Sequence, residues 1–256
     1  MGSTPASLNF NGNICAAIKQ YEKIVSKKSK AKKYISYFQN FCNTYSSAQR
    51  LEKLYNSAID DERIVALDIA TRPDCFCDEI YSLLEKINKQ KPVFVELGLQ
   101  TIHPKTAEYI RRGYTLETFD NAIFELKKRG IRVIVHQIIG LPGETDEMIF
   151  KTAEYIGKSG ADGIKFHLLY VVKGTDLEKD FNNGFFKTLS LQKYISLLEG
   201  CLENIPANVA VHRLTGDGAK KDLISPLWSA DKKHVLNEIN RRLKIDGIIQ
   251  GSKVAK

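Results

Sequence analysis

Apolar residues recur along the chain with a helical period in some segments and a strand period in others. The spacing predicts a helix over Ile14–Ser29 and then a strand over Tyr34–Phe41. Further strands are predicted over Ile64–Ala70, Val93–Leu99, Ile131–Ile139, Gly163–Val172 and Val209–Leu214. Between them we expect helices capped by Ser46 and Thr145, helices over Asp78–Lys89, His103–Arg112, Ser190–Asn204 and Asp231–Lys244, and one that ends at Gly130. The chain therefore repeats helix then strand about six times.

This alternation predicts parallel strands joined by helical crossovers. Two folds remain open, a doubly wound sheet and a (β/α) barrel. No G-x-G-x-x-G follows an early strand, which counts against a dinucleotide-binding sheet. Polar residues collect at the carboxyl ends of the strands, at Gln39, Thr71–Asp74, Gln100, Gly140–Glu144 and Arg213–Asp217. Barrel enzymes keep their chemistry at these ends, so the pattern favours the barrel.

One face of three predicted strands is unexpectedly polar. Strand side chains alternate between faces, and this alternation groups the polar residues Glu96 with Gln100, places His136 on the next strand, and groups Lys165 with His167. Parallel strands buried on both faces are normally apolar. The pattern therefore predicts a shared ligand-binding lumen. For His136 alone, a hydrogen-bonded core histidine is the structural alternative.

Composition limits the class of protein. The 256 residues include 43% hydrophobic residues, which excludes a wholly disordered chain. There is neither an apolar run of transmembrane length nor a secretory signal, and five cysteines favour a reducing cytoplasm. The net charge of +8 and the lysine-rich segment Lys27–Lys33 have two interpretations, ordinary solubility or an anionic partner such as RNA.

Three short motifs stand at strand ends: Thr71-Arg72-Pro73-Asp74, Glu96-Leu97-Gly98-Leu99-Gln100-Thr101 and His136-Gln137-Ile138-Ile139-Gly140-Leu141-Pro142-Gly143-Glu144. Each has a structural alternative. In the first, Pro73 would form a turn and Asp74 would cap the next helix. In the second, Gly98 would serve close packing of a helix on the strand. In the third, Pro142 and Gly143 suit a type II turn.

Together, and in order, these motifs resemble the radical S-adenosylmethionine (SAM) superfamily, near its YhcC-like, elongator-type and MiaB-type members. The resemblance covers nearly the whole chain. It includes Tyr37–Gln39, Asn43–Tyr45, Gly163–Lys165 with His167, Lys173–Thr175, His212–Gly218, Pro226–Ser229 and Gln250–Gly251. It implies one partial (β/α)6 TIM-like barrel over residues 1–256, with a C-terminal extension over about 205–256.

The resemblance also implies a reaction. Members of the superfamily hold a [4Fe–4S] cluster through three cysteines and reductively cleave SAM to a 5′-deoxyadenosyl radical. A reductant such as flavodoxin or ferredoxin would supply the electron, and RNA is one candidate substrate. No membrane partner is expected.

The cysteines depart from the family pattern. Cys15, Cys42, Cys75, Cys77 and Cys201 form neither C-x-x-x-C-x-x-C nor C-x-x-C, so we expect no metal ligands in this chain. Strand Tyr34–Phe41 matches the second barrel strand of the family. The first strand and its cysteine loop are therefore expected to be missing, and the chain alone to be inactive.

The resemblance assigns SAM-binding roles by position. Gln100 and Arg112 match coproporphyrinogen-type residues, and His136 stands where those enzymes have Asp. Thr71 belongs to a motif that begins with Glu in elongator-type enzymes and with Ala70 here, so Asp68 or Glu96 would bind the SAM amino group instead. The other cofactor-binding candidates are Gln39, Ile138 and Gly140, and the substrate candidates are Lys165, His167, His212 and Arg213.

Two alternatives to a radical enzyme remain. The chain could be a non-catalytic basic module that binds RNA or a protein partner, or an inactive fragment.

Overall fold

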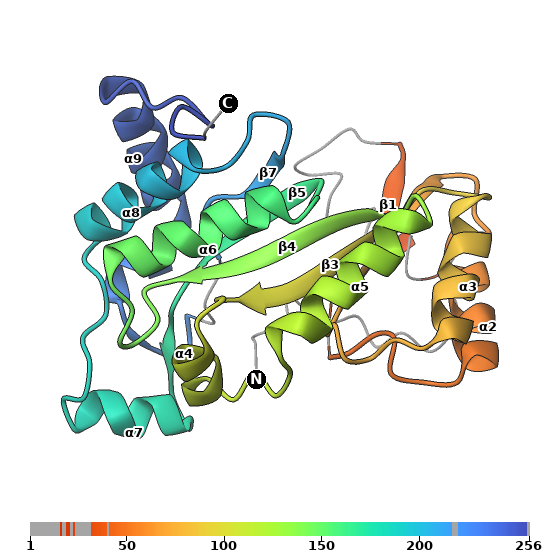
Figure 1. Ribbon diagram of the computed structural model, residues 1–256, viewed down its shortest axis with the longest axis horizontal. Coiled ribbons are helices and arrows are strands. Elements are labelled where there is room, and N and C mark those ends of the chain that lie inside the picture. The colour runs from red at the N-terminus through yellow and green to blue at the C-terminus, as the bar shows by residue number, and fades with distance from the viewer. Residues whose placement is uncertain are drawn as a thin grey trace. The chain divides into compact units, whose positions relative to one another are not determined.

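Figure 1 presents a computed structural model that describes residues 16, 19–20, 23, 32–39, 41–216 and 220–254. The chain forms two compact units. The β1–β3 unit contains the described residues up to Gly98 together with Thr118–Val133. The β4–β7 unit contains Leu99–Glu117 and the chain from Ile134 onward. Strands β3 and β4 therefore contribute residues to both units.

The main sheet has the strand order β1-β2-β3-β4-β5-β7, and β6 and β8 form a separate antiparallel pair. Its strands are β1 (Tyr34–Phe38), β2 (Ile64–Thr71), β3 (Val93–Gln100), β4 (Arg132–Ile139), β5 (Gly163–Leu168) and β7 (Ala210–Arg213). The pairs β1–β2, β2–β3, β4–β5 and β5–β7 are parallel. This is the arrangement that alternating helices and strands predict.

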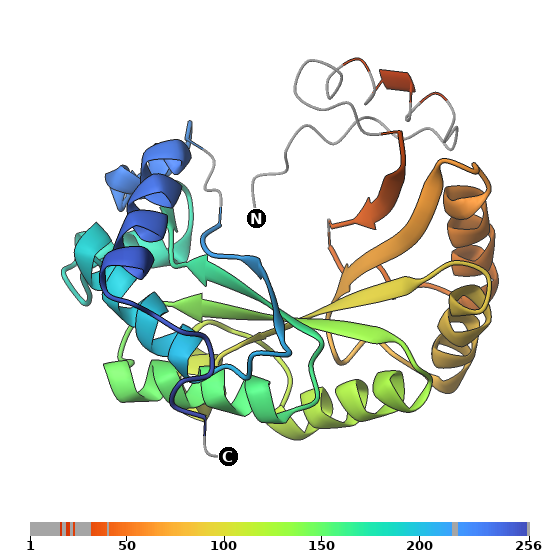
Figure 2. The same cartoon turned by 90° about the horizontal axis from the view of Figure 1, so that it is seen from above.

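In the β1–β3 unit, helices cover the apolar face of the strands. The helices are α2 (Ala48–Ile59), α3 (Asp78–Asn88) and α5 (Leu116–Lys128). Leu67 and Ile69 of β2 are fully buried, and α2 packs on both β2 and α3. Figure 2 shows α2 and α3, coloured orange, on one side of these strands. Leu51 and Tyr55 of α2 are buried, as the predicted apolar stripe requires.

The β4–β7 unit contains the remaining elements. They are α4 (Pro104–Tyr109), α6 (Asp146–Lys158), β6 (Val171–Val172), α7 (Asp176–Asn182), α8 (Leu191–Glu203), β8 (Leu223–Ser225), the 3-10 helix Leu227–Ala230 and α9 (Lys232–Ile245). Gln137 of β4 is buried and its amide donates to the carbonyl of Ile149 in α6 and contacts Cys201 in α8. Helices α6 and α8 therefore cover the Gln137 face of β4.

Helix starts follow local side-chain chemistry. The side chains of Thr145, Ser190 and Asp231 each accept a hydrogen bond from the backbone N–H three residues later. Such caps satisfy donors that the first helical turn leaves unpaired. The predicted starts of α6, α8 and α9 are confirmed. Gly130 follows α5 with φ +68°, in agreement with its predicted place just beyond a helix.

Several predicted boundaries are wrong. Strand β1 ends at Phe38 instead of Phe41, and Ser47 instead of Ser46 precedes α2. The strand predicted over Gly163–Val172 is divided into β5 and β6. Helix α7 and strand β8 were not predicted, because neither is long enough to show a clear apolar period. The helix predicted over Ile14–Ser29 lies mostly outside the described residues. Among the residues that the structure describes, no helix is long and apolar enough to span a bilayer.

Candidate functional site

In the β1–β3 unit, polar side chains share the strand face opposite the helices. Tyr37 is in register with Asp68, and Ala70 is in register with Glu96. The phenol of Tyr37 donates a hydrogen bond of 2.9 Å to Oε2 of Glu96. Glu96 is only 1% exposed. A buried carboxyl group needs such partners, because burial without hydrogen bonds is costly. The register puts Asp68 on the same strand face as Glu96, which alternation had placed on the predicted polar face.

Hydrogen bonds connect the loop after β1 with the end of β2. The Asn43 side-chain amide donates to the carbonyls of Phe38 and Ala70, at 3.0 and 2.7 Å. The phenol of Tyr55 donates to the Asn43 carbonyl at 2.5 Å. This network fixes the polar residues that follow both strands. Gln39, one residue beyond β1, is exposed.

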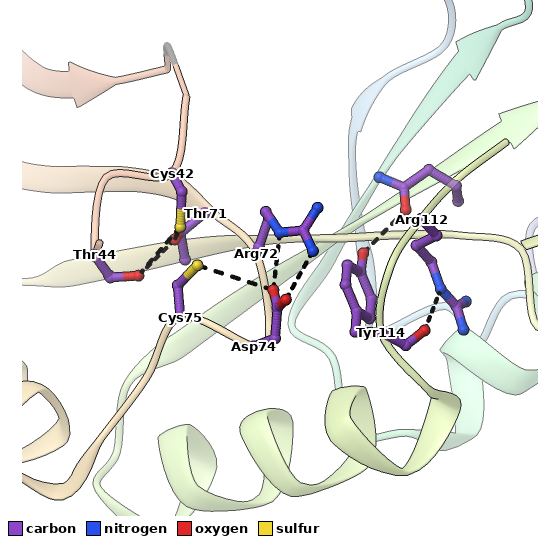
Figure 3. A network of polar contacts seen from close by, with 9 residues as sticks. Cys42, Thr44, Thr71, Arg72, Asp74, Cys75, Arg112 and Tyr114 are labelled. Carbon is purple, nitrogen blue, oxygen red and sulfur yellow. Dashed lines mark hydrogen bonds and ion pairs between the residues drawn. The ribbon is translucent and has the colours of Figure 1, made fainter. Parts of the chain in front are cut away.

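Thr71 contacts Cys42 and Thr44 at this end of β2 (Figure 3). Asp74 does not cap α3, which corrects that prediction. Its carboxylate instead accepts two hydrogen bonds from Arg72, at 2.9 and 2.7 Å, and the hydrogen bonds from Arg72 hold the pKa of Asp74 below its usual range.

In the β4–β7 unit, Arg112 supports the loop after β3. It is 7% exposed, and its guanidinium donates to the carbonyls of Leu99, Thr101 and Tyr114 at 3.3, 2.6 and 3.1 Å. Burial lowers the pKa of Arg112. These contacts give Arg112 a structural role, and its contact with SAM stays a prediction.

Gln100 has an unusual backbone conformation at the end of β3. Its φ is +63°, which is uncommon for a residue other than glycine and marks a strained position. The phenol of Tyr114 donates to its Oε1 at 3.2 Å (Figure 3). The structure therefore holds the Gln100 side chain in place.

The Gly140–Glu144 loop is the turn that the sequence predicts. Gly143 has φ +82°, and the Glu144 N–H donates to the Leu141 carbonyl at 3.2 Å. This geometry fits a type II turn. Gly140 has φ +93°, and a Cβ there would lie 2.8 Å from Leu189 Cδ1. The backbone conformation therefore favours glycine at position 140, and a larger residue would also have to displace the Leu189 side chain.

Sequence reasoning missed the buried role of Glu144. Thr101 Oγ1 donates to its carboxyl at 2.5 Å, and burial raises the pKa of Glu144. This contact joins the end of the ELGLQT motif to the Gly140–Glu144 loop. Thr101 and Glu144 each follow the end of a predicted strand. This shared position was the only feature of the sequence that could have indicated their contact.

Histidine and lysine side chains collect on one face of β4 and β5. His136 is in register with Lys165, and Ile138 with His167. The rings of His136 and His167 lie 4.9 Å apart between centroids. Because Gln137 points to α6 and α8, these residues occupy the opposite face. Lys165 is only 8% exposed.

Strand β7 extends this group. Arg213 is in register with Lys165 after an irregularity in the pairing. A Cβ at Gly163 would lie 2.6 Å from the His212 ring, so the missing side chain at Gly163 makes room for this imidazole. We define His136, Lys165, His167, His212 and Arg213 as the basic face. Strands β4, β5 and β7 carry no acidic residue.

The described cysteines do not fit the cluster of a radical SAM enzyme. Cys42 and Cys75 are half-buried, Cys77 is exposed and Cys201 is buried. Among the described residues, no group of three histidine, cysteine or acidic side chains could hold a metal ion. Cys15 lies outside the described residues.

Family models match both parts of the chain. The model of the radical SAM superfamily matches residues 16–156, and that of the Radical_SAM C-terminal domain matches residues 161–245. YtqA of Bacillus subtilis is 40% identical over 224 residues, which are 88% of this chain and 70% of YtqA. The chain therefore belongs to the radical SAM superfamily.

Elongator-type proteins are also similar. A tRNA uridine(34) acetyltransferase of Methanocaldococcus jannaschii is 31% identical over 175 residues, which cover 67% of this chain and 31% of that protein. The solved structure of Elp3 from Methanocaldococcus infernus matches with a TM-score of 0.77 and 21% identity, over 92% of this chain and 58% of that one. This likeness shows the fold, a partial (β/α)6 barrel of the radical SAM type, as the sequence predicted.

Proposed function

We propose that this chain is the SAM-binding and substrate-binding barrel of a radical SAM protein. The observation that carries the proposal is the polar strand face within a chain of this superfamily. Glu96 offers a carboxyl oxygen, which is the kind of acceptor that the SAM amino group requires. In the family, a reduced [4Fe–4S] cluster supplies the electron that cleaves SAM. The described residues provide no group of three side chains that could hold it.

Each proposed SAM-binding residue is assigned separately. In the β1–β3 unit, Asp68 or Glu96 would bind the amino group, and Gln39 and Thr71, at the ends of β1 and β2, are further candidates. In the β4–β7 unit, the candidates for other SAM contacts are Gln100, Arg112, His136, Ile138 and Gly140. Each of these assignments rests on strand position and on family resemblance.

Calorimetric titration with SAM tests this proposal. We expect saturable binding by the chain, and binding at least about tenfold weaker in Glu96→Gln, which loses the charge-assisted contact. Tyr109→Phe is the matched control, because Tyr109 is exposed and its phenol donates only to Asp180 among the hydrogen bonds described. Equal SAM affinity in Glu96→Gln and the parent chain would exclude the role of Glu96, and absent binding would exclude the proposal.

RNA is the substrate class that we propose for the basic face. The net charge of +8 and the similarity to a tRNA uridine(34) acetyltransferase support it. Fluorescence anisotropy with bulk tRNA should show binding that weakens steeply with salt. Arg213→Ala should weaken binding more than Arg241→Ala, a control in α9 whose side chain pairs with Glu238. Equal affinities would remove the basic face from RNA binding.

The two titrations also distinguish the non-catalytic alternative. A chain that binds tRNA but not SAM would be a basic binding module. A chain that binds SAM in a Glu96-dependent way, with or without tRNA, would support the enzymatic assignment.

A further inference from the structure

Two half-buried cysteines meet beside the ends of β1 and β2. Cys42 follows β1, Cys75 follows β2, and the two strands pair in parallel. The side chains of Cys42 and Cys75 are hydrogen-bonded to each other. Figure 3 shows the Cys42 sulfur beside Thr44 and Thr71, and the Cys75 sulfur with its contact to Asp74. The chain brings them together from positions 33 residues apart (75 − 42).

The sulfur of Cys42 lies in a network of hydroxyl groups. Its Sγ lies 3.0 Å from Oγ1 of Thr71 and 3.8 Å from Oγ1 of Thr44, and the two hydroxyl oxygens are 2.6 Å apart. The backbone N–H of Arg72 and the thiol of Cys75 also donate to it. Hydrogen bonds of this kind favour a thiolate over a thiol.

The pair is asymmetric. Burial alone would raise the pKa of the Cys42 thiol, but the hydrogen bonds from Cys75, Thr71, Arg72 and Thr44 together hold it below its usual range. Burial and the neighbouring Cys42 raise the pKa of Cys75 to about 12. The Cys75 sulfur also lies 3.9 Å from Oδ1 of Asp74, whose carboxylate adds to this effect. The surroundings therefore favour the charged form of the Cys42 thiol and the neutral form of the Cys75 thiol.

The surrounding network holds the two thiols in position. Asn43, adjacent to Cys42, bonds to the carbonyls of Phe38 and Ala70. Asp74, adjacent to Cys75, is held by two hydrogen bonds from Arg72. These contacts hold the two loops that carry the Cys42 and Cys75 sulfurs, and both side chains remain partly open to solvent.

We propose that Cys42 and Cys75 form a redox-active dithiol, in which Cys42 reacts with a hydroperoxide and Cys75 resolves the product. This site is independent of SAM and of the proposed substrate. Its substrate class is a small hydroperoxide, hydrogen peroxide being the simplest.

The reaction balances in two steps. The Cys42 thiolate attacks one oxygen of the O–O bond, forming a sulfenic acid, and the other oxygen leaves and takes a proton from water. Cys75 then loses its proton and attacks the Cys42 sulfur. The S–S bond forms as the S–O bond breaks, and hydroxide leaves as water with the Cys75 proton. Two thiols give two electrons to the peroxide, and a thiol reductant reverses the change.

Peptide mapping of the peroxide-treated chain tests the proposal. After anaerobic purification and exposure to hydrogen peroxide, mass spectrometry should find a Cys42–Cys75 disulfide that a thiol reductant removes. Cys75→Ala should accumulate a dimedone-reactive sulfenic acid on Cys42. In Cys42→Ala, sulfenic acid on Cys75 should form at least about tenfold more slowly, because burial and the neighbouring Asp74 carboxylate still raise the pKa of Cys75.

Cys77→Ala is the matched control, since Cys77 is exposed and only two residues from Cys75. It should leave the disulfide unchanged, and circular dichroism should show that all three variants are folded. A disulfide that includes Cys77 or Cys15 in place of either partner would overturn the proposal. Equal oxidation of Cys75 in Cys42→Ala, or free thiols at both positions after peroxide treatment, would also overturn it.

Discussion

The Tyr37 phenol and the Glu96 carboxyl group meet at 2.9 Å, although 59 residues separate them in the sequence. Tyr37 belongs to β1 and Glu96 to β3, so the hydrogen bond passes across the strand that lies between them. It partners a carboxyl group that is 1% exposed. The contact therefore links the edge strand to the residue that we propose for the SAM amino group.

Removing this hydroxyl should destabilise the chain. Tyr37→Phe leaves a buried carboxyl oxygen with one donor fewer, which costs about 1–3 kcal/mol. Urea denaturation should show a lower midpoint with an unchanged slope. Tyr109→Phe removes the hydrogen bond that an exposed phenol donates to Asp180, and it should change stability by less than about 1 kcal/mol. Equal midpoints for the two variants would show that the Tyr37 contact does not support the fold.

A methyl group at position 163 should disturb the pairing of β5 with β7. In Gly163→Ala, the new Cβ would lie 2.6 Å from two atoms of the His212 ring and 3.1 Å from the Ala210 carbonyl oxygen. Overpacking of this kind costs about 1–3 kcal/mol. Thermal denaturation of the double variant Gly163→Ala/His212→Ala should recover part of this loss, because the ring is absent. A double variant less stable than the sum of the single changes predicts would contradict the clash.

Glu144 should make stability depend on pH in the opposite direction from a surface carboxylate. Burial raises the pKa of Glu144 above the usual 4.5, so the folded state binds its proton more tightly than the unfolded state. The stabilisation that Glu144 contributes to the folded state is therefore fully present below pH 4.5. It is lost as the pH rises through the raised pKa of Glu144. Melting temperatures should show Glu144→Gln gaining stability relative to the parent chain as pH increases across this window.

Glu147 supplies the matched control. Its hydrogen bond with Lys151 holds its pKa below the usual value. Its contribution is present above 4.5 and is lost as pH falls through the lowered value. Glu147→Gln should therefore lose stability relative to the parent chain as pH increases. If both variants showed the same trend with pH, the pKa of Glu144 would not be raised in the folded protein.

The sequence allowed the fold to be predicted further than the site. Runs of apolar residues identified β2, β3 and β4, because long strands that are buried on both faces are mostly apolar. The short strand β8 and helix α7 have no such signal. In α7 the order comes from the Thr175 cap and from ion pairs such as Arg111 with Asp176, distant in sequence.

Alternation predicted which residues share a face, but not which partners they meet. It placed Glu96 on the polar face, whereas its contact with Tyr37 depends on the register of three strands. The pairing of Cys42 with Cys75 depends on two loops whose conformations are fixed by Asn43 and Asp74. Such contacts depend on the tertiary structure, so local sequence patterns do not predict them.

Iron–sulfur reconstitution should fail in this chain. Anaerobic treatment with iron and sulfide should give no stoichiometric [4Fe–4S] cluster, because the described residues offer no group of three suitable ligands. Iron and sulfide analysis with electron paramagnetic resonance provides the measurement. A stable cluster would contradict the expectation, and Cys42→Ser, Cys75→Ser and Cys77→Ser variants would then identify its ligands.

Strand β1 should mediate association between copies of the chain. It is the last strand of the sheet among the described residues, and Ile35 and Tyr37 are 52% and 39% exposed. Exposed apolar edge strands pair readily with other chains. Light scattering after size-exclusion chromatography should therefore show dimers or larger species that increase with concentration. Ile35→Lys should shift the chain toward monomer, because a charged side chain on an edge strand opposes pairing. Phe124→Lys, a control at an exposed position of α5, should not. A concentration-independent monomer with high thermal stability would show that β1 needs no further strand beside it.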